Sequence, residues 1–239
     1  HKIEDTHWWF QARKEIVLSL IARYSPAQKK KRILDVGCGT GLMLNELLKY
    51  GGVWGLDKNE KAIEYSSQKV PKANLMVGTF PEHMPQGSFD LIVALDILEH
   101  IEQDREALLR LGNALSPEGI VVITVPAYRV LWTSHDNANQ HRRRYTLPEL
   151  KQKVLDADLE IIKISYYNTL LFVPVVLKKL INRFSPQDSA SPLRDTSPPA
   201  WVNSLLRFFF ALEKHILRFM NFPFGVSLIV IASKPSKHA

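Results

Sequence analysis

The sequence has a single cysteine, Cys38, and no long uninterrupted apolar run. One cysteine excludes an internal disulfide and fits a reducing compartment. The longest apolar runs, Leu170 to Leu177 and Val226 to Ala232, are shorter than the ~20 residues of a membrane-spanning helix, and Pro174 interrupts the first. No signal peptide pattern is visible. These absences favour a cytoplasmic protein without a membrane-spanning helix.

Length and composition bound the size of the fold. The 239 residues are 46% hydrophobic and 23% charged, which suits one globular domain of α/β size with an added subdomain. The formal net charge is +7 and the isoelectric point is about 9.4. A basic balance is compatible with nucleic acid, an anionic membrane or an acidic small molecule as partner, and charge alone does not choose among them.

Apolar strand patterns alternate with helix patterns through the first half of the chain. Short runs that are almost wholly apolar indicate strands covered on both faces, whereas a spacing near 3.6 residues indicates helices. Strands are predicted at residues 33–36, 53–57, 75–77, 89–95 and 120–125, helices at 42–48, 61–70 and 104–115, and a turn at 116–119. This order predicts a parallel sheet with right-handed crossovers.

The second half is less regular. Thr146 is the expected N-cap of a helix, with Pro148 and Glu149 in the first turn. The predicted segments are a polar, aromatic loop at 127–146, a helix at 147–157, strands at 159–165 and 226–233, two apolar basic stretches at 169–184 and 201–222, and a Ser- and Pro-rich mobile loop at 185–199.

The segment Asp35 to Gly41 lies where the first predicted strand becomes a helix. Glycines there let the backbone turn sharply and approach a ligand, and the helix N-terminus offers free N–H groups. A dinucleotide-binding loop has the spacing G-x-G-x-x-G, which would place glycine at position 42, where Leu42 stands. The spacing here, G-x-G-x-G after an acid, therefore indicates a different ligand.

This loop resembles motif I of the class I methyltransferases, which wraps the amino-acid end of S-adenosylmethionine. Together with residues 89–101 and the stretch Pro117 to Pro126, the resemblance covers about residues 30–126. It implies a Rossmann-like α/β fold: a seven-stranded, mostly parallel sheet with helices on both faces, an aromatic N-terminal helix, and a helical insertion before the last strand. The implied segments are a helical cap (1–32), a cofactor-binding core (33–165), a helical insertion or lid (166–224), and the last strand with its tail (225–239).

The resemblance also implies which residues bind S-adenosylmethionine. Asp57, at the end of the second strand, corresponds to the ribose-binding acid. Thr79 stands where the family usually has an acid for the adenine, so the sequence departs from the family there. The expected cofactor-binding residues are Asp35, Gly37, Cys38, Gly39, Gly41, Asp57, Lys58, Thr79, Phe80, Leu95 and Asp96.

Asp96, Glu99 and His100 form a D-x-x-E-H pattern after the fourth strand. It is similar to the E-x-x-E-H of quinone-biosynthesis O-methyltransferases, where the acids and the histidine are linked to a divalent metal. In the alternative interpretation, Glu99 and His100 cap the next turn and orient each other. No metal ligand is assigned from the sequence.

A further pattern follows the fifth strand, W-x-x-H-D-x-x-x-x-x-H-R-R-R-Y-T, and H-W-W-F-x-x-R opens the chain. Both are similar to a group of bacterial methyltransferases. The expected proton acceptors are His141, His135 and His100, and the expected acceptor-binding residues are Trp9, Arg13, Trp132, Arg143 and Tyr145. The alternatives are a solvated basic loop, a structural hydrogen bond at His141, and core packing of the N-terminal aromatic residues.

The sequence thus predicts a methyltransferase that acts on a small or lipid-linked metabolite, with O-methylation as the favoured reaction. Two alternatives stay open: a nucleic-acid methyltransferase, for which no N/D-P-P-Y/F/W box is present, and a non-catalytic module that binds the cofactor. A dehydrogenase is disfavoured by Leu42. The apolar basic stretches predict either helices packed on the domain or a peripheral membrane contact through the C-terminal helices. The oligomeric state is not predicted.

Overall fold

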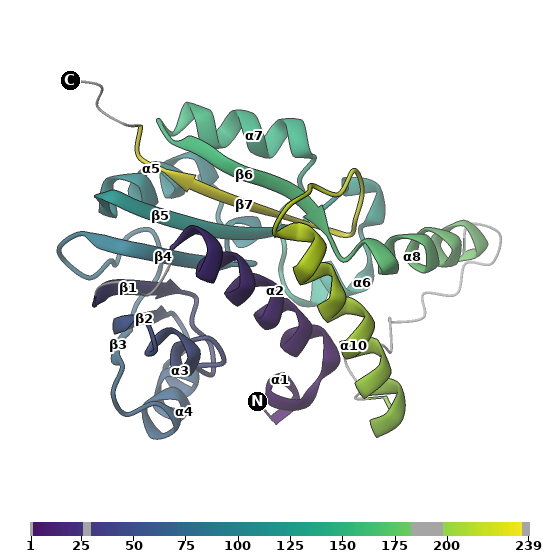
Figure 1. Ribbon diagram of the computed structural model, residues 1–239, viewed down its shortest axis with the longest axis horizontal. Helices are drawn as coiled ribbons and strands as arrows, with labels where there is room; N and C mark the ends of the chain where they lie inside the picture. The colour runs from purple at the N-terminus through teal and green to yellow at the C-terminus, as the bar shows by residue number, and fades with distance from the viewer. Residues whose placement is uncertain (1, 26–29, 183–197, 236–239) are drawn as a thin grey trace.

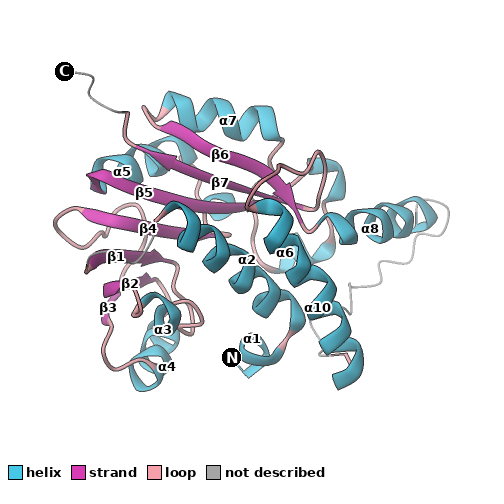
Figure 2. Cartoon of the chain, viewed as in Figure 1, coloured by secondary structure: helices cyan, strands magenta, loops and turns pink. Residues whose placement is uncertain are grey.

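A seven-stranded sheet forms the centre of the computed structural model, which describes residues 2–25, 30–182 and 198–235 (Figures 1 and 2). The strand order is β3-β2-β1-β4-β5-β7-β6, and β7 alone runs antiparallel to its neighbours. The strands are β1 (Lys31–Val36), β2 (Gly51–Asp57), β3 (Asn74–Val77), β4 (Phe89–Leu95), β5 (Leu115–Pro126), β6 (Glu160–Tyr167) and β7 (Ser227–Ser233). The predicted α/β fold with a mostly parallel seven-stranded sheet is confirmed.

Helices cover both faces of the sheet, because alternate strand residues point to opposite faces. Ile33 and Val122 pack against one set of helices, and Leu34 and Val121 against the other. The first face is covered by α2 (Trp8–Tyr24), α3 (Leu44–Leu47), α4 (Glu60–Lys69) and the end of α10 (Ala200–Leu217), and the second by α5 (Asp104–Ala114) and α7 (Leu147–Asp156). The predicted cap of α7 is confirmed, since the Thr146 hydroxyl accepts from the Glu149 backbone N–H at 3.4 Å.

The start of β5 differs from the sequence prediction. A turn was expected at residues 116–119, but β5 already begins at Leu115, which pairs with Phe89 of β4. The next pair is Leu91 with Ile120, so the turn-like residues form an irregularity within the strand. A Cβ on Gly119 would lie 2.6 Å from the Phe89 carbonyl oxygen, so glycine permits this close approach.

Short elements stand at the carboxyl ends of the parallel strands. These are α1 (Lys2–Thr6), η1 (Leu98–His100), η2 (Arg129–Leu131) and α6 (Ser134–Ala138). The sequence predicted an irregular loop at residues 127–146 and missed α6. Thr133 and Asp136 form a reciprocal capping box there, and this box explains why the helix begins.

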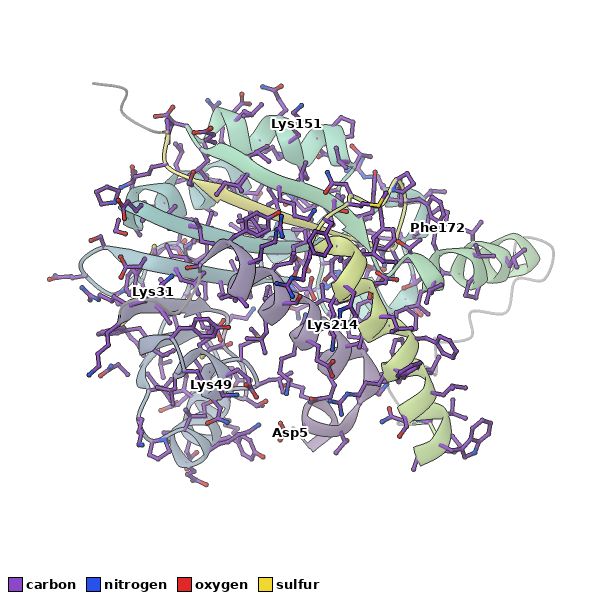
Figure 3. All side chains as sticks on the ribbon, in the orientation of Figure 1. Asp5, Lys31, Lys49, Lys151, Phe172 and Lys214 are labelled. Atoms are coloured by element: carbon purple, nitrogen blue, oxygen red, sulfur yellow. The ribbon has the colours of Figure 1, made fainter. Side chains whose placement is uncertain are left out.

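The two apolar basic stretches form α8 (Thr169–Asn182) and α10, and Pro174 lies inside α8. Lys214 of α10 and Glu15 of α2 form an ion pair at 2.8 Å, so α10 is attached along α2 (Figure 3). Most of the predicted loop at 185–199, residues 185–197, lies outside the described residues. Across the described ranges, every helix is too short or too polar to traverse a bilayer. The division of the chain into four segments stays a prediction.

A third apolar cluster joins the start of α2 to these C-terminal helices. Trp8 and Trp9 are buried against Phe210 of α10, Leu131 of η2 and the inner side of α8. Since β6 runs in the same direction as β5, α8 starts at the same edge of the sheet at which the parallel strands end. The N-terminal helix and the C-terminal helices therefore meet at one edge.

Candidate functional site

The glycine loop follows β1 and is bonded to the end of β2. Gly37, Gly39 and Gly41 all have positive φ angles, of 71°, 51° and 80°, which side chains disfavour. The Gly39 N–H donates to one Asp57 carboxylate oxygen at 2.9 Å, and the Asn59 N–H donates to the other at 2.8 Å. Asp57 thus holds the loop and the start of the next helix together at the carboxyl edge of the sheet.

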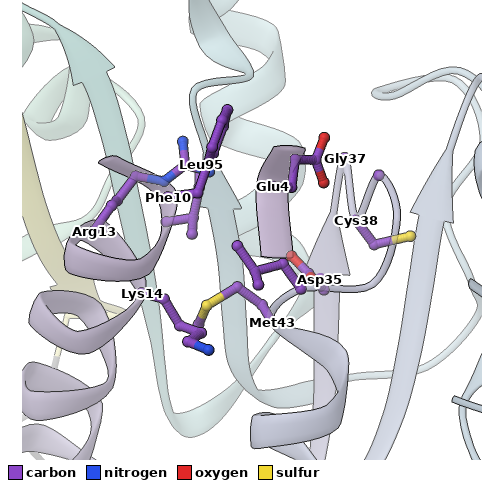
Figure 4. A pocket seen from close by; sticks show the side chains of 11 residues that line it. Glu4, Phe10, Arg13, Lys14, Asp35, Gly37, Cys38, Met43 and Leu95 are labelled. Atoms are coloured by element: carbon purple, nitrogen blue, oxygen red, sulfur yellow. The ribbon is translucent and has the colours of Figure 1, made fainter. Parts of the chain in front are cut away.

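A pocket of about 90 Å³ lies between this loop and the N-terminal helices (Figure 4). Its lining includes Asp35, Gly37 and Gly39 from the loop, Leu95 at the end of β4, and Arg13 from α2. Pockets for whole drug-sized ligands measure ~300–1,000 Å³, so this space suits one end of an extended ligand. Within the described residues, the loop thus meets α2 at a small pocket that has both charged and apolar lining residues.

Arg13 lines the glycine-loop pocket. The sequence prediction puts Arg13 with the methyl acceptor, and in the structure its guanidinium forms an ion pair with Asp96. Asp96 has a φ of 54° and also accepts a hydrogen bond from the Thr124 hydroxyl at 3.0 Å. Leu95 and Asp96 therefore lie beside the loop with Arg13 of α2 next to them, and their contact with a cofactor stays a prediction.

Asp35 is the buried acid of the pocket, and only 3% of its surface is exposed. Burial raises the pKa of Asp35 to about 8; Arg13 opposes this shift, and Asp57 adds to it. Burial likewise raises the pKa of the Cys38 thiol far above its ordinary value, so the thiol stays protonated and unreactive. Burial thus holds the pKa of the Asp35 carboxyl well above that of an ordinary aspartate.

The short helix α1 is tied down over the loop by two polar contacts. Glu4 accepts a hydrogen bond from Thr40, which follows Gly39, and Asp5 pairs with Lys69 at the end of α4. Glu4 and Phe10 also line the pocket. The sequence analysis missed Glu4 and Thr40, because nothing in their local pattern shows that residues 36 positions apart come together.

Two of the three predicted histidines lie together. His100 of η1 and His141 are arranged edge to face, with ring centroids 4.8 Å apart. Burial, followed by His141 and Lys58, lowers the pKa of His100, so His100 is neutral at pH 7. Potential ligand atoms of Glu99, His100 and His141 lie within 4.8 Å of one another. His141 thus takes the place that the D-x-x-E-H pattern gives to Asp96, which Arg13 engages.

Asp136 orients His141 from behind. Its carboxylate is wholly buried and lies 3.0 Å from His141 Nδ1, and Arg144 donates to it through Nε at 2.8 Å and Nη2 at 2.9 Å. Burial acts to raise the pKa of Asp136, but the bonds from His141 and Arg144 outweigh it and hold the pKa far below its ordinary value. An ionised carboxylate at Nδ1 favours the tautomer whose Nε2 accepts a proton.

The third histidine and one tryptophan lie apart from this pair. His135 Nε2 is 2.8 Å from the side chain of Asn139, which follows α6, and the Trp132 indole N–H donates to Asn137 at 2.9 Å. Trp9 is packed in the third apolar cluster. The two side-chain bonds between His135 and Asn139 are local, and the edge-to-face pair consists of His100 and His141.

Tyr145 and Arg143 have structural partners instead of an open surface. Tyr145 is fully buried, and its hydroxyl donates to Asp104 at 2.9 Å, which corrects the prediction that it touches the acceptor. Arg143 pairs with Asp104 at 3.0 Å and donates to the Glu102 carbonyl at 2.7 Å. Burial alone would raise the pKa of Asp104. Its contacts with Lys153, Tyr145 and Arg143 outweigh burial, so the pKa is lowered. These residues join η1 to the loop after α6.

The remaining predicted cofactor residues lie around the ends of β2 and β3. Lys58 is exposed directly after Asp57, and Thr79 is exposed, with its N–H donating to His83 at 3.2 Å. Phe80 is 9% exposed and packs in the core cluster that contains Leu56. Lys58, Thr79 and Phe80 thus follow the ends of β2 and β3, farther along the carboxyl edge than the pocket. Their contacts with a cofactor stay predictions.

Comparisons with known proteins agree with this architecture. The family described as methyltransferase domain matches residues 9–164. The ubiquinone biosynthesis O-methyltransferase of Rickettsia felis is 26% identical over 62% of this chain and 68% of its own length. The enzyme of the same name from Rickettsia canadensis is 30% identical over 47% of this chain, and the match spans half the length of that relative.

Solved structures share the fold at low sequence identity. Phosphoethanolamine N-methyltransferase 2 of Haemonchus contortus, solved with S-adenosyl-L-methionine, superposes with a TM-score of 0.62 and 20% identity. The superposition covers 91% of this chain and 52% of that one. At this identity the likeness shows the fold alone.

Proposed function

Because the chain belongs to the family of S-adenosylmethionine-dependent methyltransferase domains, we propose that it methylates a hydroxyl oxygen of a small or lipid-linked metabolite. The observation that carries this proposal is the Asp136–His141 pair beside His100, at the edge where the glycine loop lies. Methylation of a neutral hydroxyl needs a group that takes the proton. The curated relatives with the name O-methyltransferase support the same acceptor atom.

Residues around the pocket fit the parts of S-adenosylmethionine. Asp35 and Arg13 offer an acid and a guanidinium for the amino and carboxyl groups, and the backbone of the glycine loop permits close approach. Asp57 is suited to accept hydrogen bonds from the ribose hydroxyls. The bound cofactor supplies an activated methyl group on a sulfonium, and the protein supplies position and exclusion of water. This assignment moves Arg13 from the acceptor to the cofactor.

His141 is the base in this proposal. As the acceptor oxygen forms its bond to the methyl carbon, the sulfur–methyl bond breaks and the hydroxyl proton passes to His141 Nε2. The Asp136 carboxylate stabilises the imidazolium that forms, as in Ser-His-Asp enzymes. His100, neutral through its lowered pKa, borders the same space without adding a second positive charge.

Transfer of labelled methyl groups to a panel of acceptors tests the reaction. The protein is incubated with methyl-labelled S-adenosylmethionine and with phenols, sugar alcohols, their lipid-linked forms, and matched amines. We expect label in hydroxyl acceptors, stable to mild base as an ether is. Label only in amines, or only in nucleic acid added as a control, would contradict the proposal.

Asp57→Ala is expected to weaken binding of S-adenosylmethionine by about 10- to 150-fold. One charge-assisted hydrogen bond contributes ~1.5–3 kcal/mol, and tenfold in affinity corresponds to about 1.4 kcal/mol. The substitution removes the proposed ribose contact and the bond from Gly39 N–H. Calorimetric titration of both proteins measures the effect.

NAD serves as the control ligand in the same titration. The unaltered protein should bind S-adenosylmethionine and not NAD, because Leu42 replaces the third glycine of a dinucleotide loop. Equal affinity of the folded Asp57→Ala protein for S-adenosylmethionine would remove Asp57 from the site.

Binding of S-adenosylmethionine should also release a proton. The pKa of Asp35 is about 8 without ligand, so the carboxyl is mostly protonated at pH 7, whereas an ammonium ligand favours the ionised form. We therefore expect up to about tenfold tighter binding at about pH 7 than at about pH 6, and a plateau above pH 8. Titration in buffers with different ionisation enthalpies counts the released proton.

Asp35→Asn provides the control for this pH dependence, since the amide keeps the shape and cannot ionise. Its affinity should be lower and nearly the same at both pH values. The same shift predicts that the unliganded protein loses stability as pH rises from the ordinary pKa of 3.8 to about 8, because only the unfolded state ionises there. A pH-independent affinity of the unaltered protein would contradict the role of Asp35.

A further inference from the structure

Large apolar side chains are exposed along one face of α10. Trp201, Leu205, Phe208, Leu212 and Ile216 recur at spacings of three and four residues, and Phe219 continues the row just beyond the helix. Such spacing places them on one side of the helix. Trp201, Phe208 and Phe219 are 71%, 60% and 73% exposed, which is unusual for side chains of this size in a soluble domain.

The neighbouring helix α8 has a similar outer face. Leu170, Val173 and Leu177 are each more than half exposed. The inner sides of both helices are already occupied, since Phe172, Leu206 and Phe210 pack in the cluster around Trp8 and Trp9. The exposed residues therefore cannot be explained as the packing face of either helix. We name the outer faces of α8 and α10, together with Phe219 and Met220, the apolar shelf.

The described side chains of α8 and α10 expose no acid of their own, and Glu15 of α2 is paired with Arg207 and Lys214. The acid of α10, Glu213, is 3% exposed and accepts hydrogen bonds from the backbone N–H groups of Asn168 and Leu170 at 2.7 and 3.3 Å. The Arg23 guanidinium lies 5.0 Å from the centre of the Phe219 ring, and Arg218 follows α10 directly.

We propose that the apolar shelf docks on an anionic lipid bilayer, with the apolar side chains in the acyl–headgroup boundary and Arg23 among the lipid phosphates. Helices with large exposed apolar residues and basic neighbours bind at this depth, and anionic lipids strengthen the attachment. Arginine gives charge-assisted hydrogen bonds to phosphate.

A second copy of the chain fits the shelf less well. A two-fold interface places the same patch on both partners, so the outer faces of α8 and α10 on a second copy, which expose no acid among their described side chains, would offer Arg23 no carboxylate. Lipid phosphates supply the missing negative charge. Charge complementarity thus favours a bilayer over self-association.

The shelf lies near the proposed active site. α2 contributes Trp8 and Trp9 to the cluster beneath the shelf and Phe10 and Arg13 to the glycine-loop pocket. Figures 1 and 2 show α8 and α10 extending beyond the sheet on the side of its carboxyl edge. A bilayer bound there would present lipid-borne acceptors to this edge. This last point rests on the proposed function, whereas lipid binding does not.

Vesicle flotation of the full chain tests the proposal. The probes are vesicles of phosphatidylcholine alone and vesicles with about one third phosphatidylglycerol. We expect binding to the anionic vesicles, weakened at least about tenfold by Phe208→Ser with Phe219→Ser, because two apolar anchors are lost. The matched control is Leu109→Ser with Leu155→Ser, which removes two exposed leucines on α5 and α7 and should leave binding unchanged. Arg23→Glu should weaken binding to the anionic vesicles.

Two results would overturn the proposal. One is absence of vesicle binding by the folded protein. The other is a vesicle-free dimer, measured by light scattering, that Phe208→Ser with Phe219→Ser converts to a monomer, because it would assign the shelf to a second copy. His141→Ala is measured in parallel to separate the two proposals. We expect His141→Ala to lose methyl transfer and keep vesicle binding. Phe208→Ser with Phe219→Ser should lose vesicle binding and keep methyl transfer to a water-soluble acceptor.

Discussion

Gly39→Ala is expected to weaken binding of S-adenosylmethionine by a hundredfold or more while the protein stays folded. No atom lies within 4 Å of a Cβ built on Gly39, and the residue lines the pocket, so the new methyl group would occupy ligand space. The positive φ of 51° adds a folding cost of about 1–2 kcal/mol. Calorimetric titration measures the affinity, and thermal unfolding measures the cost.

Gly41→Ala separates lost space from backbone strain. Gly41 has a φ of 80°, so alanine is strained there as well, but its Cβ would lie 3.2 Å from the Ser66 hydroxyl, on the side of α4. Its stability loss should therefore be similar or larger, and its loss of affinity much smaller. Equal losses of affinity in both variants would mean that strain of the loop, and not the filled space, governs binding.

The glycine loop and Asp57 could be placed near each other from the strand pattern, and their contacts with a cofactor stay predictions. The glycine loop and Asp57 depend on strand ends and on local spacing, and the structure places them side by side. The cofactor class that the loop implied is confirmed by the family match. Each residue in this set contacts neighbours that the strand pattern alone brings to one edge.

Contacts between residues that are far apart in the sequence could not be predicted from the sequence pattern. Arg13 meets Asp96 only because α2 packs over the ends of β1 and β4, and its spacing along α2 equally suited an acceptor-binding role. Tyr145 stands in a run of polar residues that suggested a loop, but Asp104 from α5 binds its hydroxyl in the core. A one-dimensional pattern does not show which long-range partner satisfies a polar group.

The pair of His100 and His141 is a second case in which the long-range partners could not be predicted from the sequence. The sequence offered His100, His135 and His141 as equivalent bases. The capping box of Thr133 and Asp136 creates α6, turns His135 toward Asn139, and positions the Asp136 carboxylate at His141. The T-x-x-D spacing was present in the sequence and would have predicted the helix start, although not the partner of the carboxylate.

His141→Ala is expected to lower kcat for methyl transfer to a hydroxyl acceptor by about 10²- to 10⁴-fold, the range for a lost general base. The affinity for S-adenosylmethionine should change little, because the cofactor residues lie around the glycine loop. Rates with the best acceptor of the labelled panel, and titration with the cofactor, give the two readouts.

Asp136→Asn should lower kcat as well, and should also destabilise the protein by about 3–5 kcal/mol, because the buried Arg144 loses its ionised partner.

His135→Ala is the matched control, because it removes a second histidine of the same segment, whose ring bonds to Asn139, and keeps the bond between Asp136 and His141. It should keep most of the activity, and a loss equal to that of His141→Ala would contradict the assignment.

Chelation distinguishes a base from a metal ligand, since Glu99, His100 and His141 have the spacing of a cation site. Activity that falls with EDTA and returns with a divalent cation would assign His141 to a metal centre, whereas activity unchanged by EDTA leaves proton transfer as the role that the buried Asp136 supports.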